Sequence, residues 1–187
     1  MAFRRLPAGY AIRQRRSADD AALLAVENRA AELFRAYGYG IVADAPIPDI
    51  EHLRRVMAGQ VAFVAVDRDD APVGFALAAP LAGFMHLGEL SVDPAHGRKG
   101  LGGGLVAAVV DAGRQAGLVA TSLTTFRSVP FNAPFYAGLG FAELPLADAP
   151  PALRERFRAE VPDGVGAEHR ILMSLPNVPT RRFGPES

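Results

Sequence analysis

A glycine-rich segment in the middle of the chain has the composition and the position of an anion-binding turn. It runs from Gly97 to Gly104 and contains Arg98 and Lys99, between an apolar strand-like run and a helix that we expect to begin at about Leu101. Glycines at a helix start let successive backbone N–H groups converge on one anion, and the helix dipole adds positive potential there. The segment can cradle a pyrophosphate. The alternative is a glycine-rich turn with solvated charges.

Two familiar nucleotide-binding signatures do not fit this segment. The phosphate-loop pattern needs Gly-Lys-Ser/Thr after four intervening residues, whereas Gly102 is followed here by two further glycines. The stretch 102–107 matches the loose dinucleotide-binding pattern, but it lies inside the expected helix and no acidic residue ends the next strand, 119–125. The spacing therefore favours a different phosphate-bearing ligand.

Composition excludes several classes of function. Twenty Lys and Arg residues balance twenty Asp and Glu residues, so no net charge attracts nucleic acid or an anionic membrane surface. Cysteine is absent, which removes disulfides, thiolate metal sites and a cysteine nucleophile and fits a reducing compartment. We expect a cytoplasmic protein with no membrane span and no metal.

The expected organisation is a single domain. The 187 residues suffice for one sizeable core and fall short of two independent domains. We expect an N-terminal extension over residues 1–9, the domain over 10–176 and a flexible tail over 177–187.

Periodicity and turn residues predict an α/β fold, a mixed sheet flanked by helices. We expect a capping box at Ser17 with Asp20, a first helix ending at the glycines of 37–40, and a polar, irregular stretch before the last strand. The expected order is β-αα-βββ-α-β-α-β-β. Strands are expected at 10–14, 61–66, 73–79, 86–92, 119–125, 141–146 and 170–175, and helices from Ser17, over 50–57, from Leu101 and over 132–139.

Two ordered blocks resemble the GNAT superfamily of N-acetyltransferases. Val92-Asp93-Pro94 followed by the run from Gly97 to Gly102 is similar to the family's pyrophosphate loop, with Gly97 where the family usually has glutamine or arginine. The second block, 132–141, is similar to the family's later helix and its Tyr-x-x-Leu-Gly-Phe ending. The resemblance covers 10–175 and implies the acyl-CoA N-acyltransferase fold.

The resemblance implies acetyl-CoA as the acyl donor, without a metal. Backbone groups of a splayed strand would pair with the pantetheine arm, and N–H groups of the glycine loop would take the pyrophosphate. Asn132 would cap its helix, contact the cofactor, or do both. The residues expected to bind the cofactor are Leu90, Ser91, Val92, Arg98, Lys99, Gly100, Leu101, Gly102, Gly103 and Asn132.

Glu89 and Tyr136 are the residues to which the resemblance gives catalytic roles. An amine must lose a proton before it attacks, and Glu89, in an apolar run where an idle carboxylate would be costly, is the expected base. Tyr136 would protonate or hydrogen-bond the departing thiolate. The alternatives are a solvated strand carboxylate and a plain core aromatic.

The resemblance implies that the acceptor pocket lies largely on the first helical pair, where acidic and aromatic side chains suit a cationic amine. Glu27, Phe34 and His86 are the expected contacts. We rank a small-molecule amine first, with a protein N-terminus or lysine next. A non-catalytic acyl-CoA-binding sensor is the alternative from a different class, and a homodimer is a candidate assembly.

Overall fold

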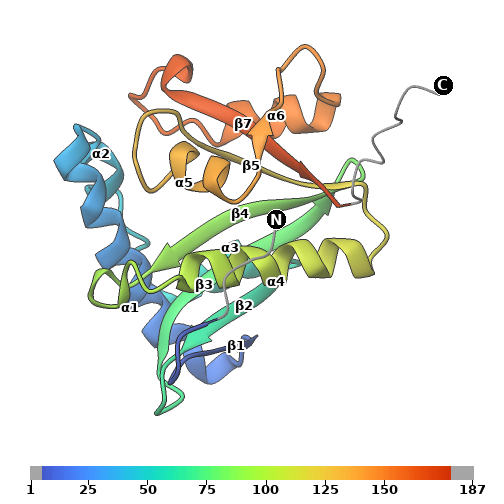
Figure 1. Cartoon of the computed structure of the whole chain (residues 1–187). Helices are drawn as coiled ribbons and strands as arrows, with labels where there is room; N and C mark the ends of the chain where they lie inside the picture. The colour runs from blue at the N-terminus through green and yellow to red at the C-terminus, as the bar shows by residue number, and fades with distance from the viewer. Residues whose placement is uncertain (1–5, 178–187) are drawn as a thin grey trace.

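A seven-stranded mixed sheet forms the centre of the computed structural model, which describes residues 6–177. The strands lie in the order β1-β2-β3-β4-β5-β7-β6, and all neighbours are antiparallel except β4 and β5 (Figure 1). The bounds are β1 Ala11–Gln14, β2 Val61–Val66, β3 Pro72–Leu81, β4 Phe84–Val92, β5 Ala120–Phe126, β6 Ala142–Glu143 and β7 Arg170–Pro176. The predicted mixed sheet is confirmed.

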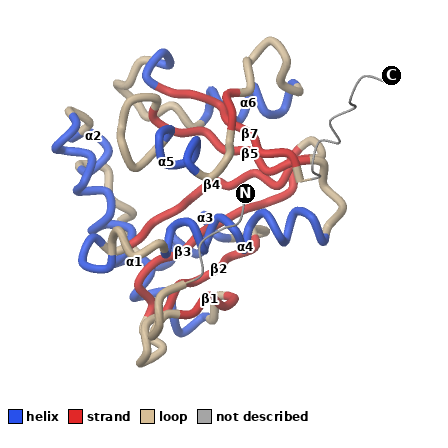
Figure 2. Tube along the Cα trace, in the orientation of Figure 1, coloured by secondary structure: helices blue, strands red, loops and turns tan. Residues whose placement is uncertain are grey.

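Helices cover both faces of this sheet (Figure 2). The α-helices are α1 Asp20–Ala31, α2 Gly40–Ala43, α3 Ile50–Met57, α4 Leu101–Gln115, α5 Ala133–Gly138 and α6 Pro151–Ala159. Short 3-10 turns occupy Ser17–Asp19, Glu32–Tyr37, Pro94–His96 and Ala167–His169. Within residues 6–177, no helix is long and apolar enough to cross a membrane.

Side-chain alternation along β3 divides the core between the two faces. Ala76 and Ala78 belong to the cluster under α4, whose Leu105 and Val109 are fully buried. Phe75 and Leu77 belong to the opposite cluster, formed with α1 and α3. The elements that were expected to carry the site are therefore fixed by two separate hydrophobic layers.

The parallel pair at the centre of the sheet is short. β4 pairs with β5 only from Phe84 to Leu87, although β4 continues to Val92 and β5 to Phe126. Figure 1 shows the two strands opening toward the end of the sheet where α1, α2 and α5 lie. Backbone groups along the second half of β4 consequently have no neighbouring strand on that side, as the splay inferred from the resemblance requires.

A β-bulge marks the point where the strands part. Leu77 of β3 pairs with Glu89 and Ala78 pairs with Leu87, so Gly88 is the extra residue. The bulge changes which face the following side chains occupy. Leu87 lies under α4, whereas Glu89, two residues later, lies on the α1 face with Leu77.

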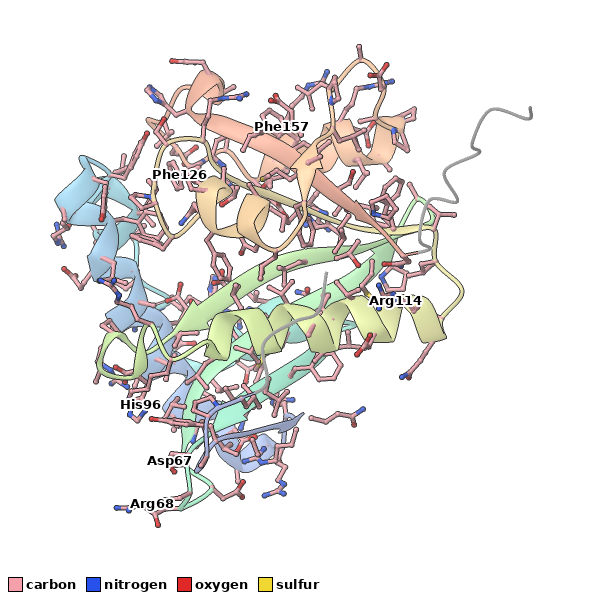
Figure 3. All side chains as sticks on the ribbon, viewed as in Figure 1. Asp67, Arg68, His96, Arg114, Phe126 and Phe157 are labelled. Carbon is pink, nitrogen blue, oxygen red and sulfur yellow. The ribbon has the colours of Figure 1, made fainter. Side chains whose placement is uncertain are left out.

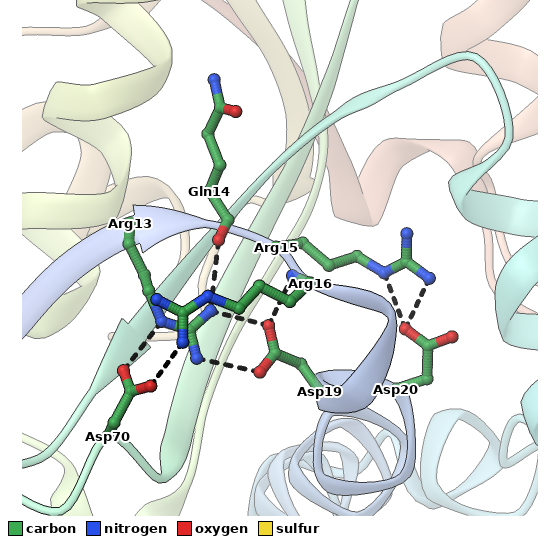
Figure 4. Close-up of polar contacts among 7 residues, drawn as sticks. All are labelled: Arg13, Gln14, Arg15, Arg16, Asp19, Asp20 and Asp70. Carbon is green, nitrogen blue, oxygen red and sulfur yellow. Dashed lines mark hydrogen bonds and ion pairs between the residues drawn. The ribbon is translucent and has the colours of Figure 1, made fainter.

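The start of α1 differs from the expected capping box at Ser17 and Asp20. The reciprocal bond is shifted one residue, because Asp19 accepts the Arg16 N–H at 2.7 Å and a bidentate bond from Arg13 (Figure 4). Asp20 instead pairs with Arg15 and with Arg54 of α3. A guanidinium on β1 outcompetes the local serine cap.

Three further elements differ from the expectations. The stretch before the last strand is not irregular throughout, because it contains α6, which buries Leu153 and Phe157. The strand expected at 141–146 is reduced to Ala142–Glu143, and the glycines of 37–40 lead into the short helix α2.

The packed part of the chain is slightly longer than the predicted domain. Leu6 contacts the core beneath α4, and Asn177, assigned to the flexible tail, is buried and bonds to Thr121 Oγ1 at 3.1 Å. Residues 1–5 of the predicted extension and residues 178–187 of the predicted tail lie outside the described residues.

Candidate active site

A cleft of about 1160 Å³ opens where β4 and β5 diverge. Pockets for one drug-sized ligand measure roughly 300–1000 Å³, so this cleft lies above the upper end of that range. It is lined by the second half of β4, the glycine loop and the start of α4, the end of β5, the start of α5, and one side of the segment from α1 to α2.

The glycine loop has the geometry of an anion cradle. Arg98 and Gly100 adopt left-handed backbone conformations, with φ of 59° and 85°, and Gly100 is the N-terminal cap of α4. No side chain of a described residue caps this helix, so the first N–H groups of α4 are left for another partner. A Cβ on Gly102 would lie 3.3 Å from Phe135 Cζ. Glycine at position 102 therefore lets the start of α4 pack closely against Phe135 of α5.

The two basic residues of the loop take different directions. Arg98 lines the cleft and is exposed. Lys99 does not line it, because its Nζ donates to the Tyr10 hydroxyl at 2.9 Å and lies over the Tyr10 ring. The structure thus separates the Lys99 ammonium from the other residues expected to bind the cofactor.

The second half of β4 presents its backbone to the cleft. Asp93 N–H donates to Val73 O on β3, and backbone groups alternate in direction along a strand, so those of Leu90 and Val92 face away from β3. In this structure Leu90 N–H donates to Glu89 Oε1 at 3.0 Å. The edge that was expected to pair with pantetheine is open, with one of its donors held by the neighbouring carboxylate.

Glu89 lies on the cleft wall with one carboxylate oxygen held in place. Oε1 accepts the Ser91 hydroxyl at 2.9 Å in addition to the Leu90 N–H. Burial raises the pKa of Glu89 above its ordinary value, and these two hydrogen bonds oppose the rise. Ser91, expected to bind the cofactor, is therefore also a partner of the expected base.

Glu27 of α1 lines the same cleft, as expected. Its Oε2 is buried and has no hydrogen-bond partner among the described residues. Burial, with a further contribution from the charge of Glu89, raises the pKa of Glu27 to about 7. A carboxyl group that changes charge near neutral pH is typical of functional sites.

Tyr136 is buried on α5 and packs edge-on against Phe135 and Phe141. It lines the cleft, and its hydroxyl bonds to no other described residue. Burial and the charge of Glu89 raise its pKa above the ordinary value of a phenol. The ring thus packs in the core, as the alternative expectation had it, and the hydroxyl has no partner among the described residues.

Asn132 precedes α5 but does not cap it through its side chain. Its Oδ1 accepts the Thr125 hydroxyl at 2.7 Å and the Phe126 N–H at 3.3 Å. The side chain ties the start of α5 to the end of β5, which corrects the expected capping role. Its Nδ2, in the cleft wall, has no partner among the described residues.

His86 is not in the cleft, contrary to the expectation that it contacts the acceptor. It is buried behind the cleft, where Nδ1 lies 3.0 Å from Ser122 Oγ and Nε2 lies 3.2 Å from Glu160 Oε1. Glu160 also accepts the Thr124 hydroxyl at 2.6 Å. The Gly88 bulge lies between His86 and Glu89, which separates the buried histidine from the part of β4 that lines the cleft.

An aromatic wall completes the acceptor end of the cleft. Phe34, the third expected acceptor contact, packs against Phe126 and Phe131 with ring centroids 5.2 Å apart in each pair, and Tyr37 packs on Phe131. Figure 3 labels Phe126 at the end of β5 beside the α1–α2 segment. This wall can hold apolar groups or a cation.

The comparison with protein families decides what this cleft belongs to. The model described as "Acetyltransferase (GNAT) family" matches residues 27–141, which include the glycine loop, β4 and α5. The chain belongs to the GNAT acetyltransferase family.

Solved GNAT structures share the fold at low sequence identity. The ribosomal-protein-S18-alanine N-acetyltransferase from Escherichia coli is 18% identical with a TM-score of 0.63, over 94% of this chain and 98% of that one. PaiA N-acetyltransferase from Thermoplasma acidophilum, in complex with coenzyme A, is 19% identical with a TM-score of 0.63, over 89% and 98%. N-acetylglutamate synthase from Neisseria gonorrhoeae, complexed with coenzyme A and N-acetyl-glutamate, is 17% identical with a TM-score of 0.67, over 92% of this chain and 36% of that one.

Arg170 also lines the cleft, although the sequence analysis did not predict it there. It begins β7, pairs in register with Phe126 and reaches the cleft through the antiparallel β5–β7 contact. An arginine at the start of a strand gives no sequence signal of burial. In residues 6–177, no group of three or more His, Asp and Glu side chains is arranged to hold a metal ion.

Proposed function

We propose that this GNAT acetyltransferase moves an acetyl group from acetyl-CoA to the amine of a small molecule, by direct attack within a ternary complex. The observation that carries the proposal is the continuity of one cleft. It joins the open glycine loop, the free edge of β4, and a wall that contains Glu27, Glu89 and Tyr136. Both substrates would therefore meet without a covalent enzyme intermediate.

The cofactor would be held mainly by the backbone. The uncapped start of α4 offers N–H groups to the pyrophosphate, with Arg98 beside them. Leu90 and Val92 offer backbone groups to the pantetheine arm, and Asn132 offers Nδ2. The side chain missing at Gly97 is not required for this arrangement, because the donors are main-chain groups. Solved GNAT structures with bound coenzyme A support the choice of cofactor.

Glu89 would take the proton from the amine. A lysine-like amine has a pKa near 10.4, so most of it is protonated at neutral pH and a base is needed. The Leu90 N–H and the Ser91 hydroxyl hold Oε1, which leaves Oε2 to accept the proton. Release of the Leu90 N–H toward the thioester oxygen would then stabilise the negative charge that develops during attack.

Tyr136 would assist the leaving group. As the C–N bond forms and the C–S bond breaks, the sulfur carries negative charge, and a thiol has an ordinary pKa of about 8.5. The pKa of Tyr136 is raised, so its hydroxyl keeps its proton and stabilises the thiolate by a hydrogen bond more than by complete transfer. Glu89 passes the first proton of the ammonium to solvent. The second proton, which the nitrogen loses after the C–N bond forms, ends on the departing thiolate through solvent and gives the thiol of coenzyme A.

Thiol release from acetyl-CoA over a panel of amines tests the proposal. We expect release that depends on both the amine and the enzyme, with small amines better than peptides or lysine-bearing proteins. Binding of acetyl-CoA without release on any amine would favour a sensor, and absence of binding would rule out both functions. Preferred release with a peptide would move the acceptor to a protein N-terminus or lysine.

A further inference from the structure

We infer that the acceptor carries a carboxylate as well as its amine, and that Arg170 binds this carboxylate. The inference deepens the proposed function and rests on it, since it names the class of acceptor as an amino acid. It starts from a guanidinium on the cleft wall that the acetyl-transfer steps do not use.

Arg170 is a half-buried arginine with open donors. It lines the cleft, and its Nε is buried without a hydrogen-bond partner among the described residues. One bond holds it, from Nη2 to the Thr124 hydroxyl at 2.9 Å. No carboxylate of a described residue forms an ion pair with it. A buried guanidinium in this state is costly, and a ligand anion would remove that cost.

Nearby carboxylates are already engaged elsewhere. Glu160 is bonded by His86 and Thr124, and Glu89 accepts from Leu90 and Ser91. Burial lowers the pKa of Arg170, and the charges of Glu160 and Glu89 oppose this shift. An arginine side chain keeps its charge in proteins because its ordinary pKa is above 12, and the remaining N–H groups of Arg170 form a fork that fits a carboxylate.

The surroundings of Arg170 fix its orientation. The guanidinium lies over the Phe126 ring, 4.7 Å from its centroid, and Thr124 Oγ1 accepts from Arg170 while donating to Glu160. His86 bonds the other oxygen of Glu160. His86, which was expected to contact the acceptor, thus helps to hold Arg170, which lines the cleft.

The charges of the cleft match a zwitterion better than a simple amine. Glu27 offers an unpartnered buried carboxyl oxygen, and Arg170 offers an unpartnered buried N–H. A monoamine would satisfy only Glu27, and a simple anion would satisfy only Arg170. An amino acid supplies one ammonium and one carboxylate, so both groups gain a partner. A peptide N-terminus supplies an ammonium with a neutral carbonyl, which leaves the arginine charge without its counter-ion.

The test compares matched pairs of acceptors. Thiol release from acetyl-CoA is measured with α-, β- and γ-amino acids and with the carboxamide of each, using wild-type protein, Arg170→Gln and Arg170→Lys. We expect the wild type to prefer acids over carboxamides by roughly 30-fold in kcat/KM, as for one desolvated charge pair. Arg170→Gln should lose that preference, and Arg170→Lys should retain part of it. The acid-to-carboxamide ratio is the readout, because the charge of Arg170 also lowers the pKa of Glu89 and its removal would change both rates together.

Arg127→Gln serves as the control, because Arg127 directly follows β5, the strand that pairs with β7, but forms an exposed ion pair with Glu143. It should leave the acid preference unchanged. Should Arg170→Gln fail to fold, the acid-to-carboxamide ratio of the wild type and of Arg170→Lys still decides the matter.

Three results would overturn the inference. Equal acetylation of acids and carboxamides by the wild type removes the role of Arg170 and leaves the amine acetyltransferase in place. A preference for carboxamides or peptides assigns the site to a peptide N-terminus. Absence of thiol release with every amine overturns the proposed function and this inference together.

Discussion

Glu27 on α1 and Glu89 on β4 lie close enough for the charge of one to act on the other. The charge of Glu89, added to burial, raises the pKa of Glu27 to about 7. Two neighbouring carboxyls resist holding two negative charges, so near neutral pH the pair holds a proton readily and gives it up readily. An ammonium that binds in the cleft would favour the ionised form of this carboxyl pair, so its binding would increase the negative charge that holds it.

Replacement of Glu89 by Gln should lower kcat at pH 7 by about 10²–10⁴, the usual contribution of general base catalysis. The raised pKa of Glu89 means that the base is protonated and idle at low pH, so the wild-type rate falls as pH falls. In the variant the acidic limb of the pH–rate profile should move to higher pH, where more of the amine is already neutral. Rates from pH 5 to 10 test this, and an unmoved limb would assign the base to water or another residue.

Replacement of Glu27 by Gln should raise the KM for the amine with a smaller effect on kcat. Because Glu27 is charged above its pKa of about 7 and neutral below it, the ratio of variant to wild-type KM should be largest near pH 8. It should approach one near pH 6. A ratio that is independent of pH would mean that Glu27 acts by shape and not by charge.

Tyr136→Phe should lower kcat by about 10–100-fold and leave the affinity for acetyl-CoA nearly unchanged, because the hydroxyl acts when the C–S bond breaks. The ring packing against Phe135 and Phe141 is kept, so folding should be intact. Single-turnover rates and cofactor titration separate the two quantities. Unchanged turnover would remove the hydroxyl from the mechanism.

Gly100→Ala should weaken acetyl-CoA binding through the backbone. Gly100 has φ of 85°, and an alanine there strains the turn by about 1–2 kcal/mol. Gly117, just beyond the other end of α4, is the matched control, with φ of 70° and, like Gly100, open space around its absent side chain. Both variants should lose similar stability, whereas only Gly100→Ala should raise the cofactor Kd. Equal cofactor affinity in both would show that the loop geometry is unimportant for binding.

Asp19→Asn should reduce the free energy of unfolding by about 2 kcal/mol, because buried Asp19 is the acceptor for Arg13 and for the Arg16 N–H. Asp70, the exposed partner of the same two arginines, is the control, and Asp70→Asn should cost less. The hydrogen bond from Arg13 holds the pKa of Asp19 below 3.8. The stabilisation that ionised Asp19 gives to the fold is therefore complete above about pH 4. It is lost as pH falls through the lower pKa that Asp19 has in the folded state. Denaturant unfolding at pH 7 and pH 3 measures both effects, and equal losses for the two variants would contradict this account.

Much of the fold follows from local pattern. Apolar spacing placed the second expected helix at Ile50–Met57 and the start of α4 at Leu101, because those segments bury a face at helical period. The helix α6 was missed although Leu153 and Phe157 are spaced four residues apart. Its many charges obscured a short apolar stripe.

The site was less predictable than the fold. Glu27, Glu89 and Tyr136 line the cleft as expected, because each belongs to a segment whose position the resemblance fixed. The positions of Arg170 and His86 depend on contacts with residues that are distant in the sequence. Arg170 reaches the cleft because β7 returns beside β5, and His86 is buried by its contacts with Ser122 and Glu160.

The bulge at Gly88 also makes the facing of side chains along β4 depend on how the strand pairs with β3. Regular pairing through Gly88, with the chain length kept, would turn Glu89 toward α4 and Leu90 toward α1. A carboxylate would then enter the apolar layer and a leucine would replace it in the cleft. Deletion of Gly88 would remove the irregularity without that exchange, because Leu87 and Glu89 would become neighbours and alternate onto the faces they already occupy.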